Sequence, residues 1–168
     1  MPVIQASEKY LMDVMFLLRK CVEDMNRRDM FHWNNSYPSS RIILDDIRNG
    51  TLYIYMENGV CRGMIVINES PAYEYADIGW KTDPENVLIV HRLAVNPVFQ
   101  GKGIGRKLME FAVQYAVESG YSSIRLDVIG SNQEANKLYR GMGFRKAGSF
   151  RFPFQETPFN CFELGLKG

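Results

Sequence analysis

The sequence has few cysteines and no residue pattern that would place it in a membrane. Its three cysteines, Cys21, Cys61 and Cys161, are an odd number, and no two of them form a C-x-x-C pair. A disulfide framework and a metal site are therefore not expected, and the reducing cytoplasm is the expected location. No apolar run approaches the roughly 20 residues that cross a bilayer. The first residues, MPVIQASEKY, also lack the basic start and apolar core of a signal peptide.

The sequence also has no marked excess of positive or negative charge. The 20 lysines and arginines are balanced by 19 aspartates and glutamates, which gives a net charge of +1. Because nucleic-acid-binding domains carry a marked basic excess, nucleic acid is not expected as a partner. The absence of a long apolar run argues likewise against a membrane partner. With 168 residues, 46% of them apolar, the chain has the length and composition of one globular domain over residues 1–168.

The most informative stretch of the chain combines a strand, a glycine-dense loop and a helix. Val87 to Val95, VLIVHRLAV, is rich in β-branched residues and is bounded by Asn96-Pro97, which predicts a strand. The loop Gln100 to Gly105 reads QGKGIG. After it, apolar residues at helical spacing predict a helix that ends near Ser119; they are Ile104, Leu108, Phe111, Ala112 and Tyr115.

This layout predicts an anion site at the start of the helix. The first turn of a helix presents N–H groups without intrahelical partners, and the helix dipole makes that end positive. Glycines allow a ligand to approach the backbone closely. Lys102, Arg106 and Lys107 add positive charge at the same place. Phosphate is the expected anion.

Two widespread phosphate-binding motifs do not fit the loop. The glycines at 101, 103 and 105 miss the third glycine of G-x-G-x-x-G, and no Ser or Thr follows Lys102 as a Walker loop requires. The loop instead reads Q-x-x-G-x-G after a strand that ends in L-A-V. This pattern resembles the first signature of the GNAT superfamily of acyl-CoA-dependent N-acyltransferases.

A second signature supports the resemblance. Asn132 to Phe144, NQEANKLYRGMGF, is similar to the family pattern N-x-x-A-x-x-L-Y-x-x-x-G-F. Its distance from the first signature leaves room for one helix and one strand, as the family requires. The close match covers Val87 to Ala147, and the rest of the chain matches only in its pattern of elements.

The predicted elements follow the order βααβββαβαββ. The strands are expected at 3–6, 51–56, 60–67, 87–95, 122–128, 144–150 and 160–166, and the helices at 8–27, 40–48, 104–119 and 132–141. Asn58-Gly59 joins the second and third strands as a hairpin. This order predicts an α/β (α+β) fold. The resemblance implies a mixed, mainly antiparallel sheet of about seven strands flanked by four helices, with splayed central strands that receive the acyl-pantetheine arm.

The resemblance also implies which residues hold acetyl-CoA, the expected co-substrate. The backbone of Leu93, Ala94 and Val95 would pair with the pantetheine amides, and the Leu93 N–H would be an oxyanion donor. The diphosphate would be held by Gln100, Gly101, Lys102, Gly103, Ile104, Gly105 and Arg106. Asn132 would either reach the pantetheine or simply cap its helix. No metal is expected.

Acylation of an amine by a thioester needs a base, an oxyanion donor and an acid. The resemblance implies that Tyr139 is the acid, and the alternative is a core tyrosine whose hydroxyl is satisfied by the protein. His91 in the central strand is a candidate base because its ordinary pKa suits proton transfer. The alternatives are a structural role for His91, with a water or one of the local carboxylates as base; these are Glu74, Asp77 and Glu85.

These features predict an N-acetyltransferase that acts on a primary amine of a small molecule or peptide by direct attack in a ternary complex. The alternatives are an acyl-CoA-binding regulatory module without catalysis and an acyltransferase for a protein N-terminus. Two aromatic segments, Phe31–Tyr37 and Arg151–Phe159, correspond to the family's acceptor region, although such aromatics could also merely pack their loops. The resemblance also admits a homodimer.

Overall fold

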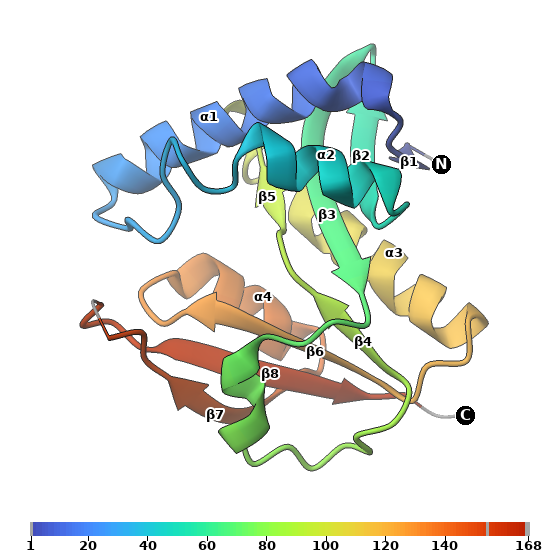
Figure 1. Ribbon diagram of the computed structural model, residues 1–168, viewed down its shortest axis with the longest axis vertical. Coiled ribbons are helices and arrows are strands. Elements are labelled where there is room, and N and C mark those ends of the chain that lie inside the picture. Colours follow the sequence, from blue (N-terminus) through green and yellow to red (C-terminus); the bar gives the residue numbers. More distant parts are fainter. Residues whose placement is uncertain (1, 154, 167–168) are drawn as a thin grey trace. The chain divides into compact units, whose positions relative to one another are not determined.

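The computed structural model describes residues 2–153 and 155–166, which form two compact units (Figure 1). The first unit comprises Met1–Ile67 and Arg92–Phe111, and the second comprises Asn68–His91 and Ala112–Gly168. Each unit contains its own set of paired strands and its own group of buried side chains.

The sheet of the first unit is antiparallel throughout. Its strands are β1 (Val3–Gln5), β2 (Leu52–Glu57), β3 (Val60–Asn68) and β5 (Ala94–Val95), and β5 pairs with β3. The predicted β2–β3 hairpin is confirmed. Asn58 and Gly59 have φ angles of 54° and 74°, because a two-residue turn that matches strand twist needs positive φ at both positions.

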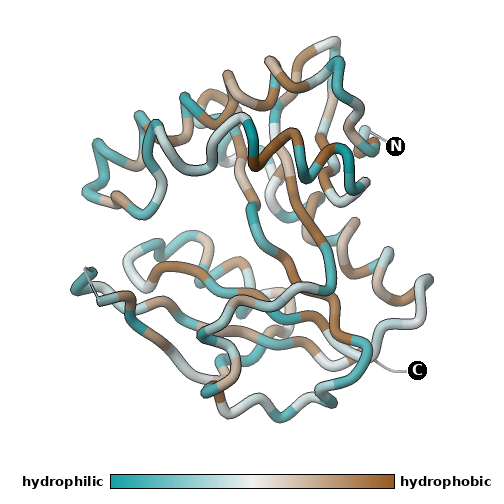
Figure 2. Tube along the Cα trace, viewed as in Figure 1, coloured by the Kyte–Doolittle hydropathy of each residue, from teal (hydrophilic) through white to brown (hydrophobic). Residues whose placement is uncertain are grey.

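Helices cover both faces of this sheet (Figure 1). A 3-10 turn, Glu8–Tyr10, leads into α1 (Leu11–Arg27), and α2 (Ser40–Arg48) begins at Ser39, whose hydroxyl accepts from the Ile42 N–H. Both helices pack on one face, and Figure 2 shows the hydrophobic stretch of β3 beneath them. The shared core consists of Ala6, Val14, Leu17, Leu18, Cys21, Ile43, Ile47, Leu52, Ile54, Cys61, Met64, Val66 and Ala94.

The opposite face of the sheet receives the first half of α3 (Ile104–Glu118) at very short range. A Cβ atom on Gly63 would lie 2.9 Å from Leu108 Cδ1, 3.1 Å from the Ala94 oxygen and 3.2 Å from Ile104 Cγ2. The absence of a side chain at Gly63 therefore sets how closely α3 approaches β3. A glycine inside a strand often marks either a β-bulge or a close approach of another segment, and Gly63 allows such a close approach.

The expectation of one central strand over 87–95 was wrong. The structure has β4 (Val87–Val90), an irregular segment at 91–93, and then β5. Of the two short strands, β4 pairs with β6 in the second unit and β5 pairs with β3 in the first. An apolar pattern indicates that a segment is buried, but it does not show where the strand is interrupted.

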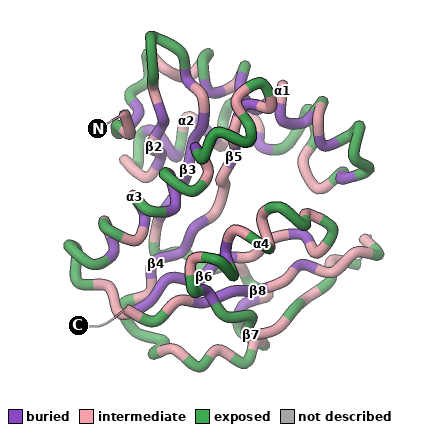
Figure 3. The backbone as a smooth tube through the Cα atoms, turned by 180° about the vertical axis from the view of Figure 1, so that it is seen from behind, coloured by how far each residue is buried: buried purple, intermediate pink, exposed green. Residues whose placement is uncertain are grey.

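The sheet of the second unit has the order β4-β6-β8-β7. Strands β4 and β6 (Ser123–Ile129) are parallel, while β8 (Phe159–Gly165) is antiparallel to both β6 and β7 (Arg145–Phe150). Figure 3 shows the buried positions along β6 and β8. Helix α4 (Gln133–Gly141) packs on one face, where Tyr139 meets Phe162. The segment 70–86, with its 3-10 helix η2 (Tyr73–Asp77), covers the other face, where Tyr75 and Cys161 belong to one cluster.

The predicted fold class is confirmed. The described residues contain eight strands, mostly antiparallel, and four α-helices in the expected order, with the eighth strand arising from the split central segment. No helix within 2–153 or 155–166 is long and apolar enough to span a bilayer.

A substitution at Gly63 tests the close packing between α3 and β3. Gly63→Ala should lower the free energy of unfolding by about 1–3 kcal/mol, because the new methyl group overpacks a buried contact. Gly141→Ala is the matched control, since a Cβ there meets no atom within 4 Å. Urea denaturation of both variants measures the difference, and equal stability would contradict the packing argument.

Candidate active site

Strand β5 bonds to β3 along one edge only. The Asn96 N–H donates to the Arg62 oxygen at 2.9 Å, and the Val66 N–H donates to the Arg92 oxygen at 3.2 Å. Because successive residues of a strand direct their backbone groups to opposite edges, the N–H and C=O groups of Leu93 and Val95 point away from β3. This edge can bond to an extended ligand as an added strand would.

The loop before α3 presents a row of backbone N–H groups. Gly101 and Gly103 adopt φ angles of 80° and 79°, which residues with a side chain rarely adopt. The first bond into the helix runs from the Lys107 N–H to the Gly103 oxygen at 3.0 Å. The N–H groups of Ile104, Gly105 and Arg106 therefore have no intrahelical acceptor. The row suits a bound anion.

Positive side chains surround this helix start. Lys102 and Arg106 are exposed, and Arg106 approaches Glu110 at 3.6 Å on the helix surface. Gln100 turns back, and its side-chain N–H donates to the Val95 oxygen at 3.5 Å. The loop and the end of β5 are thus joined by a hydrogen bond. The positive charge of Lys102 and Arg106 and of the helix start complements a diphosphate.

Tyr139 combines a buried ring with a hydroxyl that the protein does not satisfy. The residue is 5% exposed, and its ring lies 5.9 Å from the rings of both Phe144 and Phe162. The hydroxyl makes no hydrogen bond to the residues that the structure describes. Burial, and secondarily the charge of Asp127, raises the pKa of Tyr139 well above its usual value. The phenol is therefore neutral near pH 7 and is able to donate a proton.

Asn132 serves as the cap of α4. Its side-chain oxygen accepts from the Ala135 N–H at 3.1 Å, which satisfies one of the unpaired donors of the first helical turn. The side-chain oxygen of Asn132 is thus engaged in the cap. Its amide N–H groups remain as donors for a contact with the pantetheine.

His91 lies immediately after β4 with one ring nitrogen held. Its Nε2 is 2.6 Å from the Asn68 amide oxygen, which can only accept a hydrogen bond. If the ring is neutral, Nε2 must therefore carry the proton and donate it to Asn68, and Nδ1 is the nitrogen with the lone pair. Of the local carboxylates, Asp77 and Glu85 are exposed and Glu74 is half-buried.

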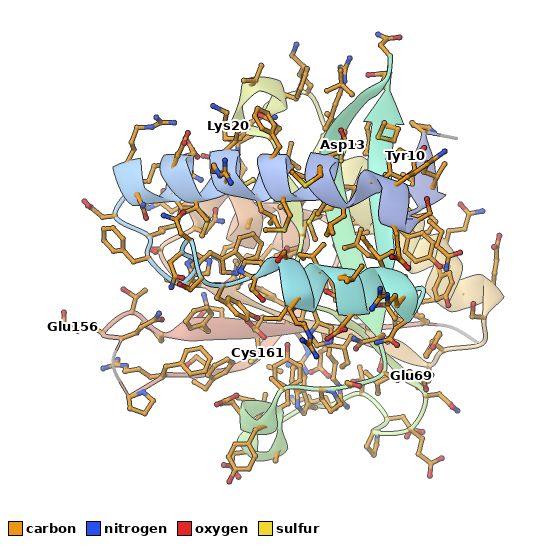
Figure 4. All side chains as sticks on the ribbon, turned by 45° about the horizontal axis from the view of Figure 1, so that its top comes forward. Tyr10, Asp13, Lys20, Glu69, Glu156 and Cys161 are labelled. Carbon is orange, nitrogen blue, oxygen red and sulfur yellow. The ribbon has the colours of Figure 1, made fainter. Side chains whose placement is uncertain are left out.

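The two aromatic segments differ in how far they pack. Trp33 lies against the core of the first unit, while Phe31 is 60% exposed. Burial lowers the pKa of His32 to about 4. In the second unit, Phe150, Phe152 and Phe159 pack on one another, and Glu156, labelled in Figure 4, lies at the outer tip of the β7–β8 loop. Phe154 lies outside the described residues.

Sequence analysis missed two buried polar pairs. In the first unit, Arg92 donates to Asp46 at 2.6 Å, next to the predicted oxyanion donor Leu93. In the second unit, the Tyr75 hydroxyl donates to Asp127 Oδ2 at 2.7 Å. Asp127 occupies a polar position of the alternating strand β6, and such a position is normally expected to face solvent.

A polar network holds the segment 70–86 over this part of β6 and β8. Glu163 is 1% exposed and accepts from the backbone N–H groups of Lys81 and Thr82 and from Arg145. Burial acts to raise the pKa of Glu163, but these hydrogen bonds outweigh it and lower the pKa. Arg125, 8% exposed, donates to the Thr82 and Asp83 oxygens. The face that carries Asp127 is therefore covered rather than solvated.

Comparison with known proteins agrees with this geometry. Residues 18–144 match the model of the acetyltransferase (GNAT) family. The N-acetylaspartate synthetase of Danio rerio is 32% identical over 66 residues, which are 39% of this chain and 23% of that protein. The chain thus matches less than a quarter of this relative's length.

Solved structures share the fold at low identity. A GNAT-family acetyltransferase of Streptococcus agalactiae superposes with a TM-score of 0.86 at 18% identity, over 99% of this chain and 95% of that one. The PaiA N-acetyltransferase of Thermoplasma acidophilum, in complex with coenzyme A, gives a TM-score of 0.76 at 16% identity, over 98% of each chain. The chain belongs to the acetyltransferase (GNAT) family.

Proposed function

We propose that the protein is an N-acetyltransferase that moves an acetyl group from acetyl-CoA to a primary amine of a small molecule or peptide. The observation that carries the proposal is the row of N–H groups without intrahelical acceptors at the start of α3, beside the Leu93–Val95 edge. The coenzyme A complex of the similarly folded PaiA protein supports the choice of ligand. The proposal includes a cytoplasmic location and one domain over residues 1–168, without metal.

In this proposal the first unit binds the coenzyme through its backbone. The outer edge of β5, at Leu93 and Val95, pairs with the pantetheine amides, and the loop from Gln100 to Arg106 holds the diphosphate. Ala94 directs its backbone groups to β3, where it pairs with Met64, and adds no such contact. Positive φ at Gly101 and Gly103 leaves the approach open, because a Cβ at either position would meet no atom within 4 Å. The amide N–H groups of Asn132 add a contact to the pantetheine.

Transfer of the acetyl group also requires an oxyanion donor, a base and an acid. The amine attacks the thioester carbonyl directly while both substrates are bound, and the Leu93 N–H stabilises the developing oxyanion. His91 accepts the amine proton, and the contact of its Nε2 with Asn68 orients the ring. Tyr139 donates its proton to the departing thiolate, whose ordinary pKa is about 8.5. The unsatisfied hydroxyl of Tyr139 favours this role over a structural one.

A regulatory module that binds acyl-CoA without catalysis is the alternative from a different class. The Tyr139 hydroxyl makes no hydrogen bond to the described residues and is available to donate a proton, a property that a pure binder does not need. An acyltransferase for a protein N-terminus is a second alternative, and it differs only in the acceptor. Release of free thiol in a screen of amines and of short peptides distinguishes all three.

A side chain at Gly103 should block coenzyme binding. We expect Gly103→Val to weaken acetyl-CoA affinity by at least about 100-fold, or about 2.7 kcal/mol, measured by isothermal titration calorimetry. Gly59→Val is the control, because Gly59 has a similar φ of 74° and equally open surroundings but lies in the β2–β3 hairpin. Equal affinity in the two variants would remove the diphosphate assignment.

Removal of the Tyr139 hydroxyl should slow turnover. Tyr139→Phe keeps the ring contacts with Phe144 and Phe162, and we expect kcat to fall by roughly 10²–10⁴-fold with little change in acetyl-CoA affinity. Tyr121→Phe, on a half-buried tyrosine of the same unit, should leave kcat unchanged. A parallel loss of affinity and turnover in Tyr139→Phe would contradict the acid role.

The pH profile tests His91. A histidine base must be unprotonated before it can accept the amine proton, so kcat/KM should fall on the acid side of the pH profile. His91→Ala should lower the rate and remove this acid limb. His32→Ala should keep it, since the pKa of His32 is lowered to about 4. An unchanged limb in His91→Ala would transfer the role to a carboxylate or water.

A further inference from the structure

Asp127 is a half-buried carboxylate that has no positive partner. Its contact within the residues 2–153 and 155–166 is the hydrogen bond from the Tyr75 hydroxyl, at 2.7 Å, and no ion pair there includes it. Burial raises the pKa of Asp127, the Tyr75 hydrogen bond lowers it, and the charge of Glu74 raises it further. A buried charge without a cation is unfavourable for folding, so its presence calls for an explanation.

The cations near Asp127 are committed to other groups. Arg125 shares its face of β6 but donates to the Thr82 and Asp83 oxygens and stacks on the Trp80 ring, with 4.6 Å between its Cζ and the ring centroid. Arg145 pairs with Glu163. The network thus neutralises Glu163 and leaves Asp127 with a single neutral donor.

A cluster of aromatic rings begins at Tyr75, the residue that donates to Asp127. The Tyr75 ring lies 6.5 Å from Phe150, which stacks on Phe159 at 5.6 Å with an interplanar angle of 10°. Phe152 meets both of these rings edge-on. Cys161, labelled in Figure 4, lies directly opposite Asp127 on β8 and belongs to the same cluster as Tyr75 and Phe150. A carboxylate beside several aromatic rings complements an ammonium group attached to a flat apolar group.

We propose that Asp127, positioned by Tyr75, binds the ammonium group of an acceptor that also carries a flat apolar group. The inference rests on the proposed function, because it names the acceptor class of that reaction. The ammonium supplies the positive charge that Asp127 lacks, and the flat group packs against Phe150 and Phe152, both of which are half-buried. Acceptors with a carboxylate beside the amine are disfavoured, since Asp127 and Glu74 repel it.

Binding can be measured without catalysis. Titration with 2-phenylethylamine, followed by the fluorescence of Trp80 beside Tyr75, should show saturable binding to the wild-type protein. Asp127→Asn should weaken it at least tenfold, while Asp77→Asn, an exposed carboxylate of η2, should not change it. The neutral analogue 2-phenylethanol should bind both proteins equally weakly. No binding to the wild type, or equal affinity in Asp127→Asn, would overturn the inference.

The positioning role of Tyr75 has a separate signature. Asp127 must be deprotonated to bind an ammonium group, so affinity should fall as the pH drops through its pKa. Tyr75→Phe removes the hydrogen bond that lowers this pKa and should move the midpoint to higher pH. The titratable groups that act on Asp127 are Tyr75 and Glu74 from η2, Cys161 from β8 and Tyr139, which lies on the α4 side of the sheet. The tyrosines and the cysteine have raised pKa values, so they stay neutral across this range; an unshifted midpoint would refute the role.

Stability provides a second independent readout. The folded pKa of Asp127 is raised, so its charge costs stability once the pH exceeds the ordinary aspartate value near 4. Asn can still accept the Tyr75 hydrogen bond but carries no charge. Asp127→Asn should therefore melt at a higher temperature than the wild type at pH 7, and the difference should vanish below pH 4. A lower melting temperature at pH 7 would mean that the carboxylate is structural, and would overturn the proposal.

Calorimetry with acetyl-CoA distinguishes failure of the proposed acetyltransferase function from failure of the proposed acceptor class. If the wild type fails to bind acetyl-CoA, the proposed function itself falls. If the wild type binds acetyl-CoA and releases thiol with amines, but amine affinity does not depend on Asp127, only the acceptor class falls. Asp127→Asn should keep wild-type affinity for acetyl-CoA, because the proposed diphosphate contacts belong to Gln100–Arg106.

Discussion

Strand β5 is bonded to a neighbour along one edge only, and the candidate coenzyme site depends on this constraint. Its inner edge is satisfied by β3, so the backbone groups of Leu93 and Val95 remain directed outward. Gly63 allows α3 to approach β3 closely, which brings the start of the helix next to the end of β5. The N–H groups without intrahelical acceptors at the start of α3 and the edge of β5 that faces away from β3 therefore lie within one short stretch of the chain. A phosphate and an extended amide chain can each find donors there.

In the second unit, the two faces of one strand carry different chemistry. On β8, Phe162 faces α4 and packs against Tyr139, while Cys161 faces the segment 70–86 near Tyr75 and Asp127. Alternation along a strand separates a phenol suited to donate a proton from a carboxylate suited to bind a cation. Glu163 and Arg125 hold the covering segment through hydrogen bonds with its backbone, so this polar strand face is partly buried.

Several parts of the fold could be predicted from local sequence. The Asn58-Gly59 turn, the helix over Ser40–Arg48 and the start of α3 depend on residues close in the chain, and the structure confirms them. The central strand was predicted as continuous because most residues of Val87–Val95 are apolar or β-branched, whereas the structure interrupts it at 91–93. The Tyr75–Asp127 pair was also missed, since the residues are 52 positions apart and an irregular loop gave no sign that it would cover β6.

The sequence by itself determined the elements, the glycine loop with its positive charges and the two signatures of an acyltransferase, because each depends on neighbouring residues or on helical and strand periodicity. Only the tertiary structure decided which neighbours each polar group has. The edge of β5, the hydroxyl of Tyr139 and the carboxylate of Asp127 owe their character to segments that pack around them from elsewhere in the chain. Burial changes the free energy of a charge or a hydrogen bond by several kcal/mol, and burial is a property of the folded neighbourhood rather than of the residue.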